Sequence, residues 1–381
     1  MKRMKQFASL AITAAMTVGM LSAAVSADDA FKIGAIGPLT GAAANYGTAV
    51  INGAQIAVDE INAAGGIGGV QIEYRGEDDE LDNEKSINAY NTLKDWGMQI
   101  LVGPTTSGCS IAVSEKTKAD NMFQLTPSGS AKDCTNYDNV FRVCFSDPNQ
   151  GRASARYIGE HGLAKKVGVI YDSSDVYSSG IFATFKEEAP NQGIEIAVEE
   201  AFTADNNVDF SSQLQKCADA GVELIFLPIY YTQAGTILQQ AAMMGLQTKW
   251  FGCDGLDGML DMDNFQKELA EGVMLLTPFA ADAEDELTQN FVAAYKAAYN
   301  VTPNQFAADA YDAVYTIKAA IEKAGVKTDM SISDICEALK TAMTEIEVTG
   351  LTGTIVWTAD GEPDKDPKAV VIEDGAYVSM Q

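Results

Sequence analysis

The alternation of short apolar runs with helix-length amphipathic segments constrains the fold of this chain more than any other feature. Residues 48–63 carry apolar side chains at helical spacing, and Gly65-Gly66 then ends the pattern. Strands that alternate with helices in this way predict parallel sheets with helices on both faces, an α/β fold. The expected strands are 32–37, 70–75, 100–102, 123–125, 167–171, 194–198, 224–227 and 273–276, and further helices are expected at 150–162, 177–189, 210–220 and 234–244.

The alternation is interrupted in ways that predict two lobes joined by three crossings. A strand at 141–145 and a turn at 147–151 precede a fresh series of units, and 277–279 forms another extended crossing. Helices dominate 284–344, and two late strands follow near 353–357 and 369–372. We expect residues 28–147 with 278–358 to form the first lobe, and 148–277 with 359–381 the second. On length alone, a single large domain with three ordinary loops stays open.

The first residues predict a secretory signal. Lys2, Arg3 and Lys5 precede an apolar stretch, and Val25-Ser26-Ala27 fits a cleavage site, so 1–27 is the predicted signal. A retained membrane anchor is the alternative. No other stretch is long and apolar enough to cross a bilayer. We therefore expect a periplasmic or secreted protein without stable membrane insertion after cleavage. We also expect a monomer.

The charge balance excludes one class of partner. The chain has 53 Asp and Glu against 26 Lys and Arg, a formal net charge of −27. Such an acidic surface repels nucleic acid and anionic lipid, so we expect no nucleic-acid partner. The acidity suits solubility and indicates nothing about the ligand.

The cysteines can form disulfides in an exported chain. Six cysteines allow fifteen pairings, and no C-x-x-C spacing of a redox pair or metal site occurs. We favour Cys109–Cys134 and Cys217–Cys253, because the members of each pair lie beside strand ends in one predicted lobe. Cys336, on a predicted helix, is expected to be a free buried thiol.

Several motifs along the chain resemble one known family. They are similar to those of the periplasmic leucine/isoleucine/valine-binding family, the type I solute-binding proteins of ABC transporters. The resemblance covers nearly the whole predicted mature chain and implies two doubly wound parallel-sheet lobes, three crossover hinges and a ligand in the cleft between the lobes. The motifs are Ile36-Gly37-Pro38-Leu39-Thr40-Gly41, Asn45-Tyr46-Gly47, the helix within 52–67, Val102-Gly103-Pro104-Thr105-Thr106-Ser107, Leu125-Thr126-Pro127-Ser128, Phe141-Arg142-Val143, Asp147-Pro148-Asn149-Gln150-Gly151, Tyr177 and Tyr230-Tyr231.

Three serines follow predicted strands of the first lobe. Ligands of parallel sheets lie beyond the carboxyl ends of the strands, where Ser107, Ser128 and Ser130 stand. Hydroxyls and free N–H groups at a helix start can hold a carboxylate without a cation. The resemblance implies that these residues hold the α-carboxylate of the ligand. The alternative for Ser107 is a capping residue of its own helix.

An acid and four aromatic residues complete the expected site. The resemblance implies that Asp254 pairs with the α-ammonium of the ligand; a turn hydrogen bond is the alternative. The neighbouring acids do not have EF-hand spacing, so no metal is expected. By the same resemblance four aromatic residues enclose the ligand, although core packing competes, above all for the last of them, whose neighbours depart from the family pattern. The four are Tyr46, Tyr177, Tyr230 and Phe306.

These features predict a binding protein rather than an enzyme. His161 is the only histidine and lies at a predicted helix end, and no catalytic triad order, zinc motif or phosphate loop occurs. We expect capture of a branched-chain or other neutral amino acid, without cofactors, for delivery to an ABC transporter permease. The predicted hinges are 146–149, 277–279 and 358–360. Small amides or urea as ligands, and a receptor subunit that senses the ligand, stay open as alternatives.

Overall fold

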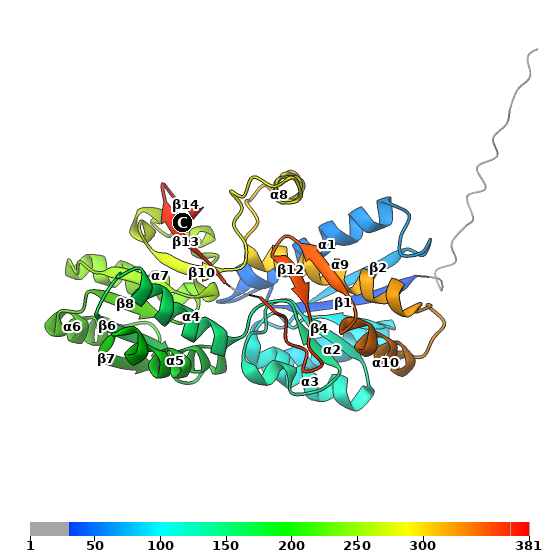
Figure 1. The fold of residues 1–381 in the computed structure, drawn as a ribbon, viewed down its shortest axis with the longest axis horizontal. Helices are drawn as coiled ribbons and strands as arrows, with labels where there is room; N and C mark the ends of the chain where they lie inside the picture. The colour runs from blue at the N-terminus through cyan, green and yellow to red at the C-terminus, as the bar shows by residue number, and fades with distance from the viewer. Residues whose placement is uncertain (1–29, 366, 381) are drawn as a thin grey trace, which may run out of the picture.

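The computed structural model describes residues 30–365 and 367–380. The predicted signal at 1–27 lies outside the described residues. Two sheets, each covered by helices, lie side by side, and the chain passes between them (Figure 1). We call the five-stranded sheet with the helices that contact it the first lobe, and the seven-stranded sheet with its helices the second lobe. In the described part of the chain, no helix has the length and apolar character of a bilayer span.

The first lobe is built on a wholly parallel sheet in the order β2-β1-β3-β4-β5. Side chains alternate between its faces: Ile33 and Ala35 of one strand join one core cluster, whereas Ile36 joins another with Tyr90 and Leu93. Helices therefore cover both faces, as the alternation predicted. The elements are β1 (Phe31–Gly37), α1 (Ala44–Ala63), β2 (Ile72–Asp78), α2 (Asn83–Trp96), β3 (Ile100–Val102), α3 (Ser107–Asp120), β4 (Phe123–Thr126) and β5 (Val140–Arg142).

The second lobe is built on a sheet in the order β14-β13-β10-β9-β8-β6-β7. Five strands are parallel, and the last two, β13 and β14, add antiparallel at one edge. Helices α4 and α5 pack against one face, and residues of α6 and α7 belong to the cluster on the other. The elements are α4 (Asp147–Glu160), β6 (Lys166–Asp172), α5 (Val176–Glu188), β7 (Glu195–Phe202), α6 (Ser211–Ala220), β8 (Leu224–Leu227), α7 (Tyr231–Met244), β9 (Lys249–Gly252), β10 (Met274–Thr277), β13 (Lys368–Glu373) and β14 (Ala376–Ser379).

The segment between β10 and β13 returns to the first lobe. Helix α9 (Gln305–Ala324) packs along α1, α8 (Glu286–Tyr299) also contacts α1, and α10 (Ile332–Met343) packs against α9 and β4. Figure 1 shows α9 and α10 beside the first sheet. A separate hairpin of β11 (Glu347–Gly350) and β12 (Gly353–Val356) follows. Asp312 of α9 holds the turn of that hairpin, because its carboxylate accepts the N–H groups of Leu351 and Thr352.

The third crossing between the lobes stays in contact with the first lobe beyond the predicted hinge, as far along the chain as Lys365. The backbone oxygen of Gly361 accepts the N–H of Arg142, and the Glu362 carboxylate pairs with the Arg142 guanidinium at 2.8 Å. Lys365 then pairs with buried Asp309 of α9 at 3.3 Å. The predicted hinge at 358–360 therefore lies within chain that still contacts the first lobe. The first predicted hinge, 146–149, overlaps the start of α4 at Asp147.

The favoured disulfides are wrong. All six cysteines are buried and free. Cys217 of α6 contacts Gly168 on one face of the second sheet, whereas Cys253 packs with Phe251 in the cluster on the opposite face. The sulfur of Cys134 faces the backbone oxygen of Ser107 at 3.7 Å. Position beside a strand end did not reveal on which side of the sheet each thiol would lie.

Candidate functional site

The structure brings the eight predicted site residues around one cavity between the lobes. The cavity is also lined by Thr105, Thr106 and Gly255, which the sequence does not predict as site residues. The free volume is about 10 Å³, roughly the space of one water molecule. Side chains of the two lobes therefore nearly fill the cavity, and a ligand needs the lobes to move apart before it can enter.

The serines of the first lobe form a polar wall at the start of α3. Ser107 is the first residue of that helix, and its hydroxyl accepts the N–H groups of Ser130 and Ala131 at 3.2 and 3.0 Å. The residue in the capping position is Thr106, so Ser107 does not cap its own helix. Ser128 donates to the backbone oxygen of Thr105 at 2.7 Å. The wall is held rigidly by these bonds between two strand-to-helix loops.

Two hydroxyls on this wall lack partners. The Oγ atoms of Thr106 and Ser130 are buried and make no hydrogen bond within the described chain. A buried polar group without a partner is costly, and positions of this kind often mark a site that a ligand completes. Thr106 directly precedes Ser107 in the loop after β3, so the rule that ligands lie beyond strand ends could have selected it.

Asp254 lies on the opposite wall, just after β9. Its side chain is buried, and the Tyr177 hydroxyl donates to Oδ1 at 2.7 Å. Burial raises the pKa of Asp254 to about 6, while the hydrogen bond from Tyr177 acts in the opposite direction. No cation contributes to this pKa among the described residues. The carboxylate faces the cavity with a phenol beside it instead of an ammonium or guanidinium.

A second buried acid lies close to the polar wall and was missed. Asp147 begins α4 and is fully buried, and its N–H donates to the backbone oxygen of Ser130 at 2.8 Å. Burial raises its pKa well above the usual range, and the charge of Asp254 raises it further. The motif Asp-Pro-Asn favours turns, so the sequence predicts a turn residue at Asp147. Nothing local in the sequence indicated that the carboxyl would be buried.

The four aromatic residues meet in one cluster drawn from both lobes. The ring of Tyr46 lies 4.2 Å from that of Phe306 and 5.4 Å from that of Tyr230, centroid to centroid. Tyr177 and Tyr230 of the second lobe lie 5.0 Å apart. Phe306, at the start of α9, therefore packs on the cavity wall instead of in a remote core. The rings supply apolar surface between the serines and Asp254.

Direct hydrogen bonds join the lobes across this cavity. The Tyr46 hydroxyl donates to the backbone oxygen of Gly255 and accepts the N–H of Tyr231 at 3.2 Å. Beside it, the amide of Asn45 donates to the backbone oxygen of Gly258 at 3.0 Å. These contacts define a closed arrangement, which explains the small volume of the cavity.

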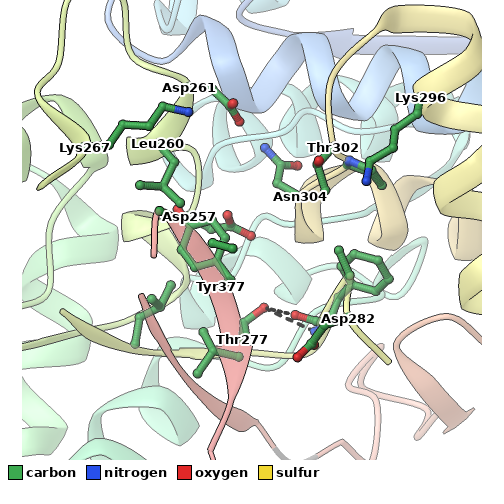
Figure 2. A pocket seen from close by; sticks show the side chains of 17 residues that line it. Asp257, Leu260, Asp261, Lys267, Thr277, Asp282, Lys296, Thr302, Asn304 and Tyr377 are labelled. Atoms are coloured by element: carbon green, nitrogen blue, oxygen red, sulfur yellow. Dashed lines mark hydrogen bonds between the residues drawn. The ribbon is translucent and has the colours of Figure 1, made fainter. Parts of the chain in front are cut away.

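Larger cavities lie elsewhere and contain few of the predicted residues. One of about 310 Å³ adjoins the site through Thr106 and Tyr230. Another of about 360 Å³, drawn in Figure 2, includes none of the eight. We assign the candidate site by the convergence of polar and aromatic groups from both lobes rather than by volume, because closure itself reduces the volume.

A family model and curated relatives match this chain over most of its length. A family model described as "Periplasmic binding protein" matches residues 30–376. The leucine-, isoleucine-, valine-, threonine- and alanine-binding protein of Pseudomonas aeruginosa is 30% identical over 86% of this chain and 86% of its own. The Leu/Ile/Val-binding protein BraC3 of Rhizobium johnstonii is 31% identical over 91% of this chain and 95% of its own.

Solved structures show the same fold. The substrate-binding protein LivJ of the Streptococcus pneumoniae branched-chain amino acid transporter, in complex with isoleucine, superposes with a TM-score of 0.83 at 31% identity, covering 92% of this chain and 98% of its own. The leucine-binding protein LivK of Thermotoga maritima reaches 0.82 at 25% identity, over 92% and 97%. A Rhodopseudomonas palustris solute-binding protein in complex with benzoate reaches 0.81 at 23% identity, over 92% and 95%. The last shares the fold although its ligand is not an amino acid.

Proposed function

This chain belongs to the periplasmic binding protein family, and from that membership we propose that it captures a small neutral amino acid between its lobes and delivers it to a membrane permease of the ABC class. We also propose that it acts outside the cytoplasm, as a monomer and without catalysing a reaction. The predicted signal supports the location outside the cytoplasm, and the names of the relatives support binding.

The observation that carries the proposal is the chemical contrast between the two walls of the cavity. One wall offers hydroxyls and the N-terminus of α3, which suit a carboxylate. The other offers buried Asp254, which lacks a cation among the described residues and gains one when an ammonium binds. A free amino acid carries both groups on one carbon atom, so it satisfies both walls at once.

The aromatic cluster favours a neutral side chain. Tyr46, Tyr230 and Phe306 present ring surface to the cavity, and apolar surface gains free energy when it is removed from water. Leucine, isoleucine and valine, which the names of several relatives include, fit such a surface. We therefore propose a branched-chain or other neutral amino acid as the ligand.

Replacement of Asp254 tests this assignment. Asp254→Ala removes the partner of the ammonium, and we expect calorimetry to detect no binding of L-leucine or L-isoleucine. Asp263→Ala is the matched control, because Asp263 lies exposed nearby in the sequence and the change should leave affinity unaltered. Unchanged affinity in Asp254→Ala would refute the role of this acid. A thermal-shift screen over amino acids, small amides and urea identifies the ligand.

A further inference from the structure

The cavity of about 360 Å³ in Figure 2 lies apart from the site described above, and we call it the hinge cavity. Its walls are the segment 257–261 after β9, the β13–β14 hairpin, the link from β10 to α8, and residues at the end of α8 and before α9. These elements belong to both lobes and to the passage between them. The hinge cavity is large enough for a molecule of several heavy atoms.

Asp257 gives the hinge cavity a specific chemical feature. The residue is only 4% exposed, and its Oδ2 accepts the N–H of Gln305, the first residue of α9, at 2.9 Å. Its Oδ1 is buried and has no hydrogen-bond partner in the described chain. Figure 2 shows the side chain on one wall, facing the side on which Asn304 and Lys296 lie. A buried carboxylate oxygen without a donor is costly, so this position favours a ligand that donates.

The charges around the cavity differ in how firmly they are held. Lys267 and Lys296 line it as well, but both are exposed and can extend into water. Asp261, also exposed, adds a second carboxylate near Asp257. Asp257 cannot leave its position, because it is buried and bonded to α9. Burial raises the pKa of Asp257 to about 7, and a cation bound beside the carboxyl group favours its ionised form.

The remaining walls indicate what kind of cation fits. Leu260, Phe279 and the ring of Tyr377 line the cavity. A hydrated metal ion gains nothing from such apolar surface, whereas an ammonium on a hydrocarbon body buries that body against it. The acceptor and the apolar walls together match a primary alkylammonium.

We propose that the hinge cavity is a second ligand site, which binds a small primary ammonium with an apolar body through Oδ1 of Asp257. The ammonium donates to that oxygen, and the hydrocarbon lies against Leu260, Phe279 and Tyr377. Gln305 keeps its bond to Oδ2, and side chains around the buried Oδ1 must shift for the ammonium to reach it.

Titration of n-butylammonium, with butan-1-ol as the uncharged control, tests the proposal. We expect calorimetry to show binding of n-butylammonium, with and without saturating L-leucine, and none of butan-1-ol. Asp257→Asn keeps an oxygen for Gln305 but removes the charge, and it should weaken binding at least about tenfold. Asp282→Asn is the matched control on the same cavity, because the Asp282 carboxylate already accepts from Ser379, and it should change affinity less than about twofold.

The proposal is overturned if the wild-type protein does not bind n-butylammonium, or if Asp257→Asn binds it as well as the wild type. Should Asp257→Asn fail to fold, Ala376→Trp serves instead: Ala376 is exposed on β14, and a large ring there fills the cavity from its rim. Unchanged binding in that variant also overturns the proposal. Asp254→Ala separates the two sites, since it should abolish leucine binding and leave n-butylammonium binding intact.

Discussion

Asp254 is a buried acid, and no cation among the described residues contributes to its pKa. Asp254 is ionised less readily than a free aspartate, because burial raises its pKa to about 6. A group whose pKa is higher in the folded than in the unfolded state costs stability when it is charged, so Asp254 destabilises the ligand-free protein as the pH rises from about 4 through 6. A bound ammonium offsets this cost. The proposed pairing of Asp254 with the ligand therefore predicts that ligand affinity depends on pH.

We predict that amino-acid affinity falls about tenfold between pH 7 and pH 5, because below about pH 6 the ligand must displace a proton from Asp254. Calorimetry over this range measures the change, and titration near pH 6 in two buffers of different ionisation enthalpy should detect proton release on binding. An affinity that stays constant from pH 5 to pH 7 would contradict the pairing of this carboxylate with the ligand.

The six cysteines are buried free thiols. Burial raises the pKa of Cys109, Cys134, Cys217 and Cys336 to about 12, so little thiolate is available to react. We expect Ellman's reagent to label the native protein slowly and to detect six thiols after denaturation. A reductant should leave the midpoint of thermal unfolding unchanged. A lower count of thiols in the denatured chain would show that disulfides form after all.

Among the elements, the pair α1 and α9 ties the returning segment to the first lobe. The two helices approach closely at Gly53, where a Cβ atom would lie only 2.1 Å from the backbone oxygen of Ala307. The next residue after Phe306 thus meets α1, so this contact also positions the aromatic ring on the cavity wall. The close packing of α1 and α9 at Gly53 therefore holds Phe306 in place on the cavity wall.

We predict that Gly53→Ala lowers the free energy of unfolding by about 1–3 kcal/mol, because backbone atoms of α9 must move to admit the methyl group. Gly180→Ala on α5 is the control: the nearest atom to its Cβ would be 3.5 Å away, and alanine favours helix. Chemical denaturation should find this variant as stable as the wild type or more so. Equal stability of Gly53→Ala and the wild type would contradict the close approach.

For the whole molecule, closure depends on polar contacts between the lobes. Tyr46 of the first lobe bonds to Gly255 and Tyr231 of the second, and Gln305 of α9 donates to the backbone oxygen of Asp254 at 2.8 Å. A ligand can shift such an equilibrium only by contacting both lobes in the closed form. The walls of the candidate site come from both lobes, so the ligand that we propose there would meet this condition.

We predict that Tyr46→Phe favours the open form, because it removes the bond to Gly255 and leaves the Tyr231 N–H without its acceptor. The radius of gyration of the ligand-free protein, measured by X-ray scattering, should increase, and leucine affinity should fall about tenfold. Tyr74→Phe removes a hydroxyl that bonds to Ile51 within the first lobe, so it should leave the radius unchanged. An identical radius for Tyr46→Phe and wild type would argue against closure through this tyrosine.

Sequence reasoning predicted much of the fold because its signals are local. Buried parallel strands such as β3 and β8 are continuous apolar runs, and both were predicted with the bounds that the structure has. The short hairpin strands β11 and β14 were missed, since their partly exposed residues carry no such run. Seven of the eight residues around the candidate site stood at strand ends or in recognisable motifs, and parallel strands bring their carboxyl ends to one edge. Phe306 was predicted from the family resemblance alone, because it lies at the start of a helix and its neighbours depart from the family pattern.

Other features depend on contacts between residues far apart in the chain, and these only the folded molecule could reveal. Whether Cys217 and Cys253 can form a disulfide depends on the face of the sheet on which each thiol lies. The course of the third crossing involves the ion pair of Lys365 with Asp309. One wall of the hinge cavity involves the hydrogen bond from the N–H of Gln305 to Asp257. The periodicity of apolar residues indicates on which face of its own helix or strand a residue lies. Whether a charged side chain is buried depends on which other elements pack over that face.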